Sequence, residues 1–123
     1  MPPVRLVAFK GAEGCLIAAW FDTLPEPAYV KGMARIRRLA ELGYEIRRPE
    51  ADYLEEGIYE LRWRFQSVNY LVLYFFHGRE TVVLSHGLTK EDRVPPREID
   101  LALRNKAQFL RNPAAHTHRG ELS

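Results

Sequence analysis

The first third of the chain contains one short apolar segment, followed by two segments with helical spacing. Residues 4–9 are mostly apolar and end at Gly11, which predicts a first strand. Apolar residues then recur every three or four positions over 13–21 and again over 28–42. This spacing predicts two helices, the first ended by the prolines that follow it and the second capped by Gly43.

The middle of the chain changes from a helical period to strict alternation. Residues 47–56 are polar and largely acidic, and they predict a loop. From residue 59 to residue 66 apolar and polar side chains alternate, which is typical of a strand with one buried face. Residues 70–76 are apolar or aromatic at every position and predict a central strand covered on both faces.

The last part of the chain predicts a hairpin and a helix. Residues 77–79 supply a turn, residues 81–86 a returning strand, and residues 89–94 a polar loop. Pro95 and Pro96 then open a helix with one apolar stripe. The stripe consists of Ile99, Leu103, Ala107 and Leu110.

The predicted order is therefore β-α-α-β-β-β-α, which indicates the α+β class. We expect a small, mainly antiparallel sheet packed against helices on one side. The 123 residues are enough for one core, so residues 1–111 are expected to form a single domain. Residues 112–123 lack any period and are expected to form a mobile tail.

Composition narrows the possible classes of function. The net charge is only +2, but Arg supplies 14 of the 18 cations, and Arg pairs well with phosphate. A nucleic-acid role therefore stays open, although high Arg usage also follows from genome composition. The single cysteine, Cys15, leaves neither a disulfide nor a cysteine-built zinc site, and we expect no cofactor and no metal. No apolar run is long enough for a membrane span and no secretory signal is visible, so a cytoplasmic location is expected.

The candidate chemistry lies on one strand and one loop. Alternation places Arg62 and Arg64 together on the polar face of their strand, roughly 7 Å apart. His86, Lys90 and Arg93 lie at and after the end of a strand that returns beside the central one. All five are therefore expected to line one open surface of the sheet, suited to RNA phosphates.

Such a set has the groups that metal-independent cleavage of RNA requires. One group must take the proton of the 2′-hydroxyl, cations must stabilise the phosphate, and an acid must protonate the leaving 5′-oxygen. His86 is the candidate acid or base, with Arg62, Arg64 and Lys90 in the electrostatic role and Arg93 beside them.

Each candidate also has a purely structural interpretation. Alternating Arg on a strand is often a solvated face, and His86 beside a glycine is more often bonded to backbone than catalytic. His116 and His118 have no third metal ligand in view. The aromatic residues of the 70–76 segment are expected in the core rather than in a base-stacking surface.

Four segments also follow one another in a recognisable order. They are Gly57–Arg62, Tyr70–Phe76, Leu84–Gly87 with Lys90, and Pro96–Ile99 with Ala102. In this order they resemble the RelE/HigB toxin superfamily and, within it, the phage-derived Gp49-like (HigB-type) branch. The opening strand, the 20–25 stretch and the two helices also look like that branch, so the resemblance covers nearly the whole chain.

The resemblance implies a RelE-like fold and the toxin of a type II toxin-antitoxin system. Such a toxin is a ribosome-dependent mRNA endoribonuclease, an mRNA interferase. The implied partners are mRNA on the ribosome, a helix-turn-helix (HigA-like) antitoxin, and operator DNA through that antitoxin. Arg62 matches a basic residue of the family's active strand, and Lys90 matches the first basic residue of its loop.

Two features depart from the family's pattern. Leu71 stands where family members usually carry Arg, and Lys90 is followed by Glu91 and Asp92 rather than by a second lysine. These departures favour a second hypothesis, a catalytically weakened or gyrase-inhibiting RelE/ParE-like binding module that acts through its antitoxin and DNA.

Overall fold

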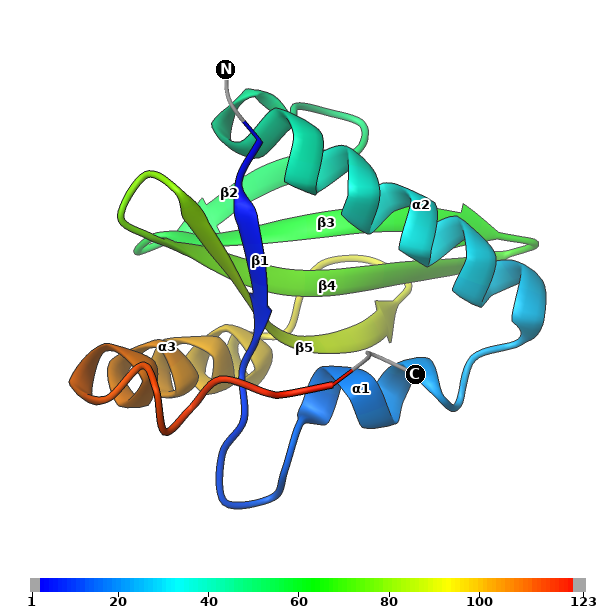
Figure 1. Cartoon of the computed structure of the whole chain (residues 1–123). Helices are drawn as coiled ribbons and strands as arrows, with labels where there is room; N and C mark the ends of the chain where they lie inside the picture. The colour runs from blue at the N-terminus through cyan, green and yellow to red at the C-terminus, as the bar shows by residue number, and fades with distance from the viewer. Residues whose placement is uncertain (1–2, 121–123) are drawn as a thin grey trace.

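The computed structural model describes residues 3–120 as one sheet with helices on both faces (Figure 1). Its five strands lie in the order β1-β5-β4-β3-β2, and all pairs are antiparallel except β1 with β5. The elements are β1 (Arg5–Ala8), α1 (Leu16–Phe21), α2 (Glu26–Leu42), η1 (Gly43–Glu45), β2 (Ala51–Glu55), β3 (Ile58–Phe65), β4 (Val68–His77), β5 (Thr81–Lys90) and α3 (Pro96–Arg111). The predicted α+β class and mainly antiparallel sheet are confirmed.

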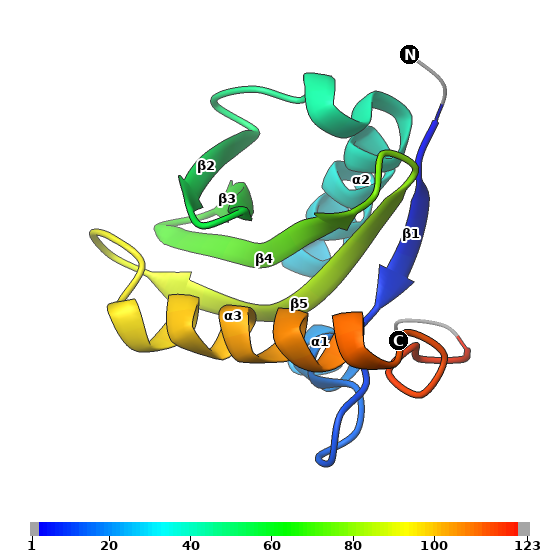
Figure 2. The same ribbon diagram turned by 90° about the vertical axis from the view of Figure 1, so that its left-hand side faces the viewer.

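The expectation of helices on one side of the sheet is wrong. α1 and α2 pack on one face, and α3 packs on the other (Figures 1 and 2). The cause is β4, whose Leu71, Leu73 and Phe75 point toward α3 while Val72 and Tyr74 point toward the other helices. A strand that is apolar at successive positions needs cover on both faces.

The predicted loop over 47–56 and the predicted end of the last strand also need correction. Residues 51–55 form β2, which pairs with β3, and β5 continues through Thr89 to Lys90. Both segments lie at the rim of the sheet, where only part of the strand is buried. Polar side chains face solvent there, so neither segment carries the apolar alternation by which a strand is predicted.

Two close approaches fix the helices on their face of the sheet. A Cβ atom at Gly32 of α2 would lie 2.5 Å from the Trp63 ring, and one at Gly87 of β5 would lie 2.1 Å from the ring of Trp20. The Trp63 indole N–H donates to the carbonyl of Ala28 at 3.0 Å. The Trp63 ring of β3 therefore packs directly against the backbone of α2, and this contact holds the residues of β3 in place.

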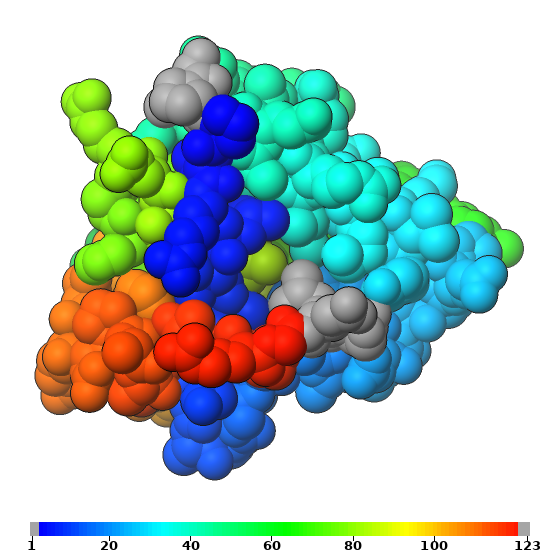
Figure 3. All heavy atoms as spheres, in the orientation of Figure 1, coloured from blue at the N-terminus to red at the C-terminus, as the bar shows by residue number. Residues whose placement is uncertain are grey.

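The described part of the C-terminal tail lies across the chain that follows β1 (Figure 3). The amide of His118 donates to Ala8, the amide of Lys10 donates to His116, and the His116 ring stacks on Phe9. Mobility of residues 112–123 stays a prediction, and its last three residues lie outside the described part. No helix within residues 3–120 is long and apolar enough to cross a bilayer.

Candidate phosphate-binding corner of the sheet

The polar face of β3 opens into a pocket of about 410 Å³ at a corner of the sheet that α3 leaves uncovered. We call it the phosphate pocket. It is lined by Pro49, Arg62, Trp63, Arg64, Asn69, Leu71, Lys90 and Asp92. The pairing of β4 with both neighbours explains the set, because Asn69 lies opposite Arg64 on one side and opposite Lys90 on the other.

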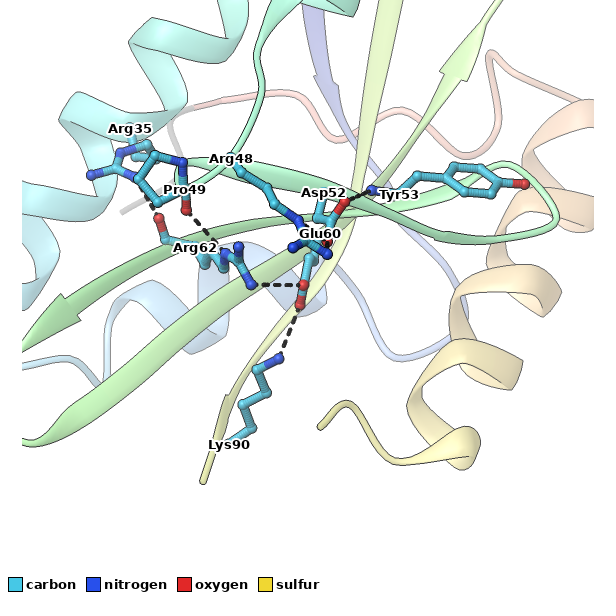
Figure 4. A network of polar contacts seen from close by, with 8 residues as sticks. All are labelled: Arg35, Arg48, Pro49, Asp52, Tyr53, Glu60, Arg62 and Lys90. Carbon is cyan, nitrogen blue, oxygen red and sulfur yellow. Dashed lines mark hydrogen bonds and ion pairs between the residues drawn. The ribbon is translucent and has the colours of Figure 1, made fainter. Parts of the chain in front are cut away.

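A buried carboxylate holds two of the pocket's cations (Figure 4). Glu60 is only 3% exposed, and its oxygens lie 3.3 Å from Arg62 Nη1 and 3.3 Å from Lys90 Nζ. Arg62 is fixed further by its Nε, which donates to the carbonyl of Pro49 at 3.0 Å. Both cations therefore have defined positions, and the Glu60 carboxylate offsets part of their positive charge.

The backbone of β3 beyond β2 is held by side chains of α2. β2 pairs with β3 only up to Leu61, and the Arg62 amide donates to the carbonyl of Glu50 at 2.9 Å, so the edge is open beyond that bond. Arg35 donates to the carbonyl of Arg62 at 2.7 Å, and Lys31 donates to the carbonyl of Arg64 at 3.2 Å. The edge carbonyls of both pocket arginines are therefore satisfied by α2 rather than left open for another strand.

Two acidic residues on the segment beside the pocket are neutralised by arginines. Arg38 donates two hydrogen bonds to Glu50, and this contact lowers the pKa of the Glu50 carboxyl. Arg48 pairs with Asp52 at 2.6 Å, and its hydrogen bond lowers the pKa of Asp52. Both carboxylates therefore remain charged and paired at neutral pH.

Arg64 is the cation of the pocket with the most open position. It is exposed, its Nε donates to the carbonyl of Gln66 at 3.2 Å, and no carboxylate lies within ion-pair distance among the described residues. It also lines a second hollow, against α2, whose charged residues are Lys31, Arg35, Arg38 and Glu50. Arg64 is therefore available to an anionic group from solvent.

His86 does not line the open surface, which corrects the expectation that it shares a site with Arg62. It lies on the same face of the sheet but is 4% exposed beneath α3. Its Nε2 is 3.0 Å from a Glu98 oxygen and its Nδ1 is 2.9 Å from Ser85 Oγ, which accepts a hydrogen bond from Asn105 at 3.0 Å. We call these four residues the sealed cluster.

The hydrogen bonds of the sealed cluster fix the tautomer of His86. A carboxylate only accepts, so Nε2 carries the proton and Nδ1 accepts from the Ser85 hydroxyl. Burial lowers the pKa of His86 against the opposing effect of Glu98. The ring is thus a neutral structural group that joins β5 to α3.

Arg93 is exposed in the loop after β5 and is not among the residues that line the phosphate pocket. The structure therefore brings together Arg62, Arg64 and Lys90, and separates His86 and Arg93 from them. The sequence does not predict the role of Glu60, because alternation places it beside the two arginines but does not reveal that it is buried between Arg62 and Lys90. No group of three or more metal-ligating side chains occurs within residues 3–120.

Comparison with protein families places the chain. A family model described as "Phage derived protein Gp49-like (DUF891)" matches residues 19–107, from α1 into α3. The matched span includes every residue that lines the phosphate pocket. A search of curated proteins finds no match.

Proposed function

Because the chain belongs to the phage-derived Gp49-like family, whose members are related to toxin-antitoxin systems, we propose that it is the toxin of a type II pair. On this proposal it is a metal-independent endoribonuclease that cuts mRNA on the ribosome. Its partners are a helix-turn-helix (HigA-like) antitoxin and, through that antitoxin, operator DNA.

One observation supports this proposal most strongly, namely that three cations converge on one uncovered pocket. Arg62 and Lys90 are held by Glu60, whereas Arg64 points to solvent. Cations positioned in this way stabilise the extra negative charge that a phosphodiester gains during cleavage. Its volume of about 410 Å³ lies within the usual range of pockets for small ligands.

The proposed reaction uses the ribose 2′-hydroxyl as nucleophile. Its oxygen attacks phosphorus as the proton leaves, the bond to the 5′-oxygen breaks, and a 2′,3′-cyclic phosphate and a 5′-hydroxyl result. Asp92 is the carboxylate that lines the pocket and is assigned as proton acceptor, and the Lys90 ammonium is assigned as proton donor. His86 has no part in this mechanism because α3 covers it.

Expression with and without the neighbouring antitoxin gene tests the proposal. We expect growth arrest and cleaved mRNA only without the antitoxin, with a loss of roughly 10²–10³-fold in cleavage for Arg64→Ala. Arg79→Ala, in the exposed turn between β4 and β5, is the matched control. Normal growth and intact mRNA on free expression would contradict the proposal.

A second candidate function is a weakened nuclease or gyrase inhibitor that acts as a binding module. Leu71 favours it. This fully buried apolar residue lines the pocket at a position where an arginine would supply a further cation. The lining also contains no histidine among the described residues. Leu71→Arg separates the alternatives: a weakened nuclease gains mRNA cleavage, whereas an inhibitor of another target does not. A thermal melt of the variant checks that it remains folded.

A further inference from the structure

A second and larger cavity, of about 570 Å³, lies between η1 and the β2–β3 hairpin. We call it the tyrosine pocket. It is lined by Tyr44, Ile46, Arg47, Arg48, Ala51, Asp52, Tyr53 and Tyr59. The lining thus brings three aromatic rings and two guanidinium groups around one cavity.

Two of the tyrosine rings are exposed but rigidly held. Tyr53 is 51% exposed, its hydroxyl accepts a hydrogen bond from the Gly57 amide at 3.0 Å, and its ring packs edge-on against Tyr59 at 5.0 Å. Tyr44 is 37% exposed, stacks on Phe76 at 3.6 Å, and donates to the carbonyl of Gly78 at 3.2 Å. Fixed rings bind a flat partner with little loss of side-chain entropy.

The arginines at the rim favour an anionic partner. Arg48 is an exposed residue and neutralises Asp52, the carboxylate in the lining, at 2.6 Å. Arg47 is also exposed, and one nitrogen of its guanidinium donates to the backbone carbonyls of Tyr44 and Ile46. The guanidinium of Arg47 is thereby held at the mouth of the pocket, where its positive charge is not offset by a carboxylate within ion-pair distance among the described residues.

One short segment of chain separates the two pockets. Pro49 lines the phosphate pocket, whereas Arg48 and Asp52 line the tyrosine pocket. Figure 4 shows Arg48 and Asp52 between Tyr53 on one side and the contact of Arg62 with Glu60 on the other. Arg62 pairs with Leu71 on the α3 face of the sheet, whereas Tyr59 pairs with Tyr74 on the α2 face. A strand of RNA that places one phosphate at Arg62 would therefore reach the tyrosine pocket by passing around the β2 edge.

We propose that the tyrosine pocket binds a nucleotide of single-stranded RNA, with its base on Tyr53 and its phosphate at Arg47 and Arg48. The nucleotide neighbours the one whose phosphate occupies the phosphate pocket, so this inference rests on the proposed function. Aromatic rings with flanking arginines are the chemistry by which proteins bind single strands without pairing. An apolar peptide segment would use the rings but not the two cations.

The test is fluorescence anisotropy with the full chain and a 5′-labelled RNA that carries 2′-O-methyl groups and so cannot be cleaved. Tyr53→Leu keeps apolar bulk but removes the ring, and we expect a loss of roughly 5- to 100-fold in affinity, as for one lost base stack. Arg47→Ala should lower the slope of log affinity against log salt by about 0.7. Leu110→Ala, on α3 and 50% exposed, is the matched control and should bind as the wild type does.

A second readout locates the base directly. RNA with a single 4-thiouridine is crosslinked by light and the labelled peptide is identified by mass spectrometry. We expect the label on the peptide that carries Tyr53. Labels elsewhere, together with unchanged affinity of Tyr53→Leu, would overturn the inference.

The outcomes separate this inference from the proposed function. If Arg64→Ala weakens RNA binding while Tyr53→Leu does not, the phosphate pocket stands and the tyrosine pocket is not an RNA site. If no variant changes RNA binding because the wild type does not bind, both proposals fail. If Tyr53→Leu loses affinity for the purified antitoxin but keeps its affinity for RNA, the tyrosine pocket is a protein-docking surface and the inference is overturned.

Discussion

Two clusters of polar side chains lie on the same face of the sheet, and they differ in whether α3 covers them. At the phosphate pocket, Glu60 pairs with Arg62 and Lys90 at the uncovered rim. In the sealed cluster, His86 is bonded to its neighbour on β5 and to α3. The first group presents net positive charge to solvent, and the second has every polar atom satisfied inside the protein. The position of one helix thus decides which polar residues are available to a ligand.

The largest expected effect comes from removing the buried carboxylate at the open corner. Glu60→Ala leaves two partly buried cations without their counter-charge, since the side chains of Arg62 and Lys90 are 30% and 15% exposed. We expect the free energy of unfolding to fall by roughly 2–3 kcal/mol, less than for a fully buried pair. Urea denaturation measures it, and exposed Glu91→Ala should change it by less than about 0.5 kcal/mol.

The next largest change in the free energy of unfolding is expected in the sealed cluster, and it tests whether this cluster has only a structural role. Asn105→Ala removes the donor to Ser85 in a fully buried setting. The free energy of unfolding should fall by about 1–3 kcal/mol because a buried polar group loses its partner. RNA affinity per folded molecule should stay as in the wild type. If the Asn105→Ala protein is fully folded and still binds RNA more weakly than the wild type, the sealed cluster does not have a purely structural role.

The pH dependence of stability gives a smaller effect from the same cluster. Burial lowers the pKa of His86, so the unfolded chain takes up its proton near pH 6.5 and the folded chain only at lower pH. The free energy of unfolding should therefore fall as the pH drops below about 6.5, by at most about 1.4 kcal/mol per unit from this group.

His86→Gln should remove that contribution. Urea denaturation at several pH values compares its slope with that of the wild type. Leu110→Ala, at an exposed position of α3, is the control without a titrating group and should keep the wild-type slope. Equal slopes for His86→Gln and the wild type would show that the ring does not resist protonation.

The smallest effect on stability is expected at Arg64, where the effect on RNA is large. Arg64 is exposed, so its replacement by Ala should change the free energy of unfolding by less than about 0.5 kcal/mol. RNA binding should lose one phosphate contact, which lowers the slope of log affinity against log salt by about 0.7 for a single strand. Anisotropy titrations at several salt concentrations measure it.

Much of the fold follows from the sequence because its signals are local. The alternation over β3 places Arg62 and Arg64 on one face, and the pocket shows both there. The sequence does not predict β2, because a short edge strand that contains Asp52 and Glu55 has the composition of a loop. The misplacement of His86 has a different cause, since no local pattern tells which part of a sheet face a distant helix covers.

The proposed function is tested most directly by measuring mRNA cleavage by the purified protein on translating ribosomes, with the 5′-ends mapped. We predict cleavage by the wild type and by Asn105→Ala, and a loss of roughly 10²–10³-fold for Arg64→Ala. Intact mRNA with the wild type, or cleavage by Arg64→Ala as fast as by the wild type, would contradict the proposed function.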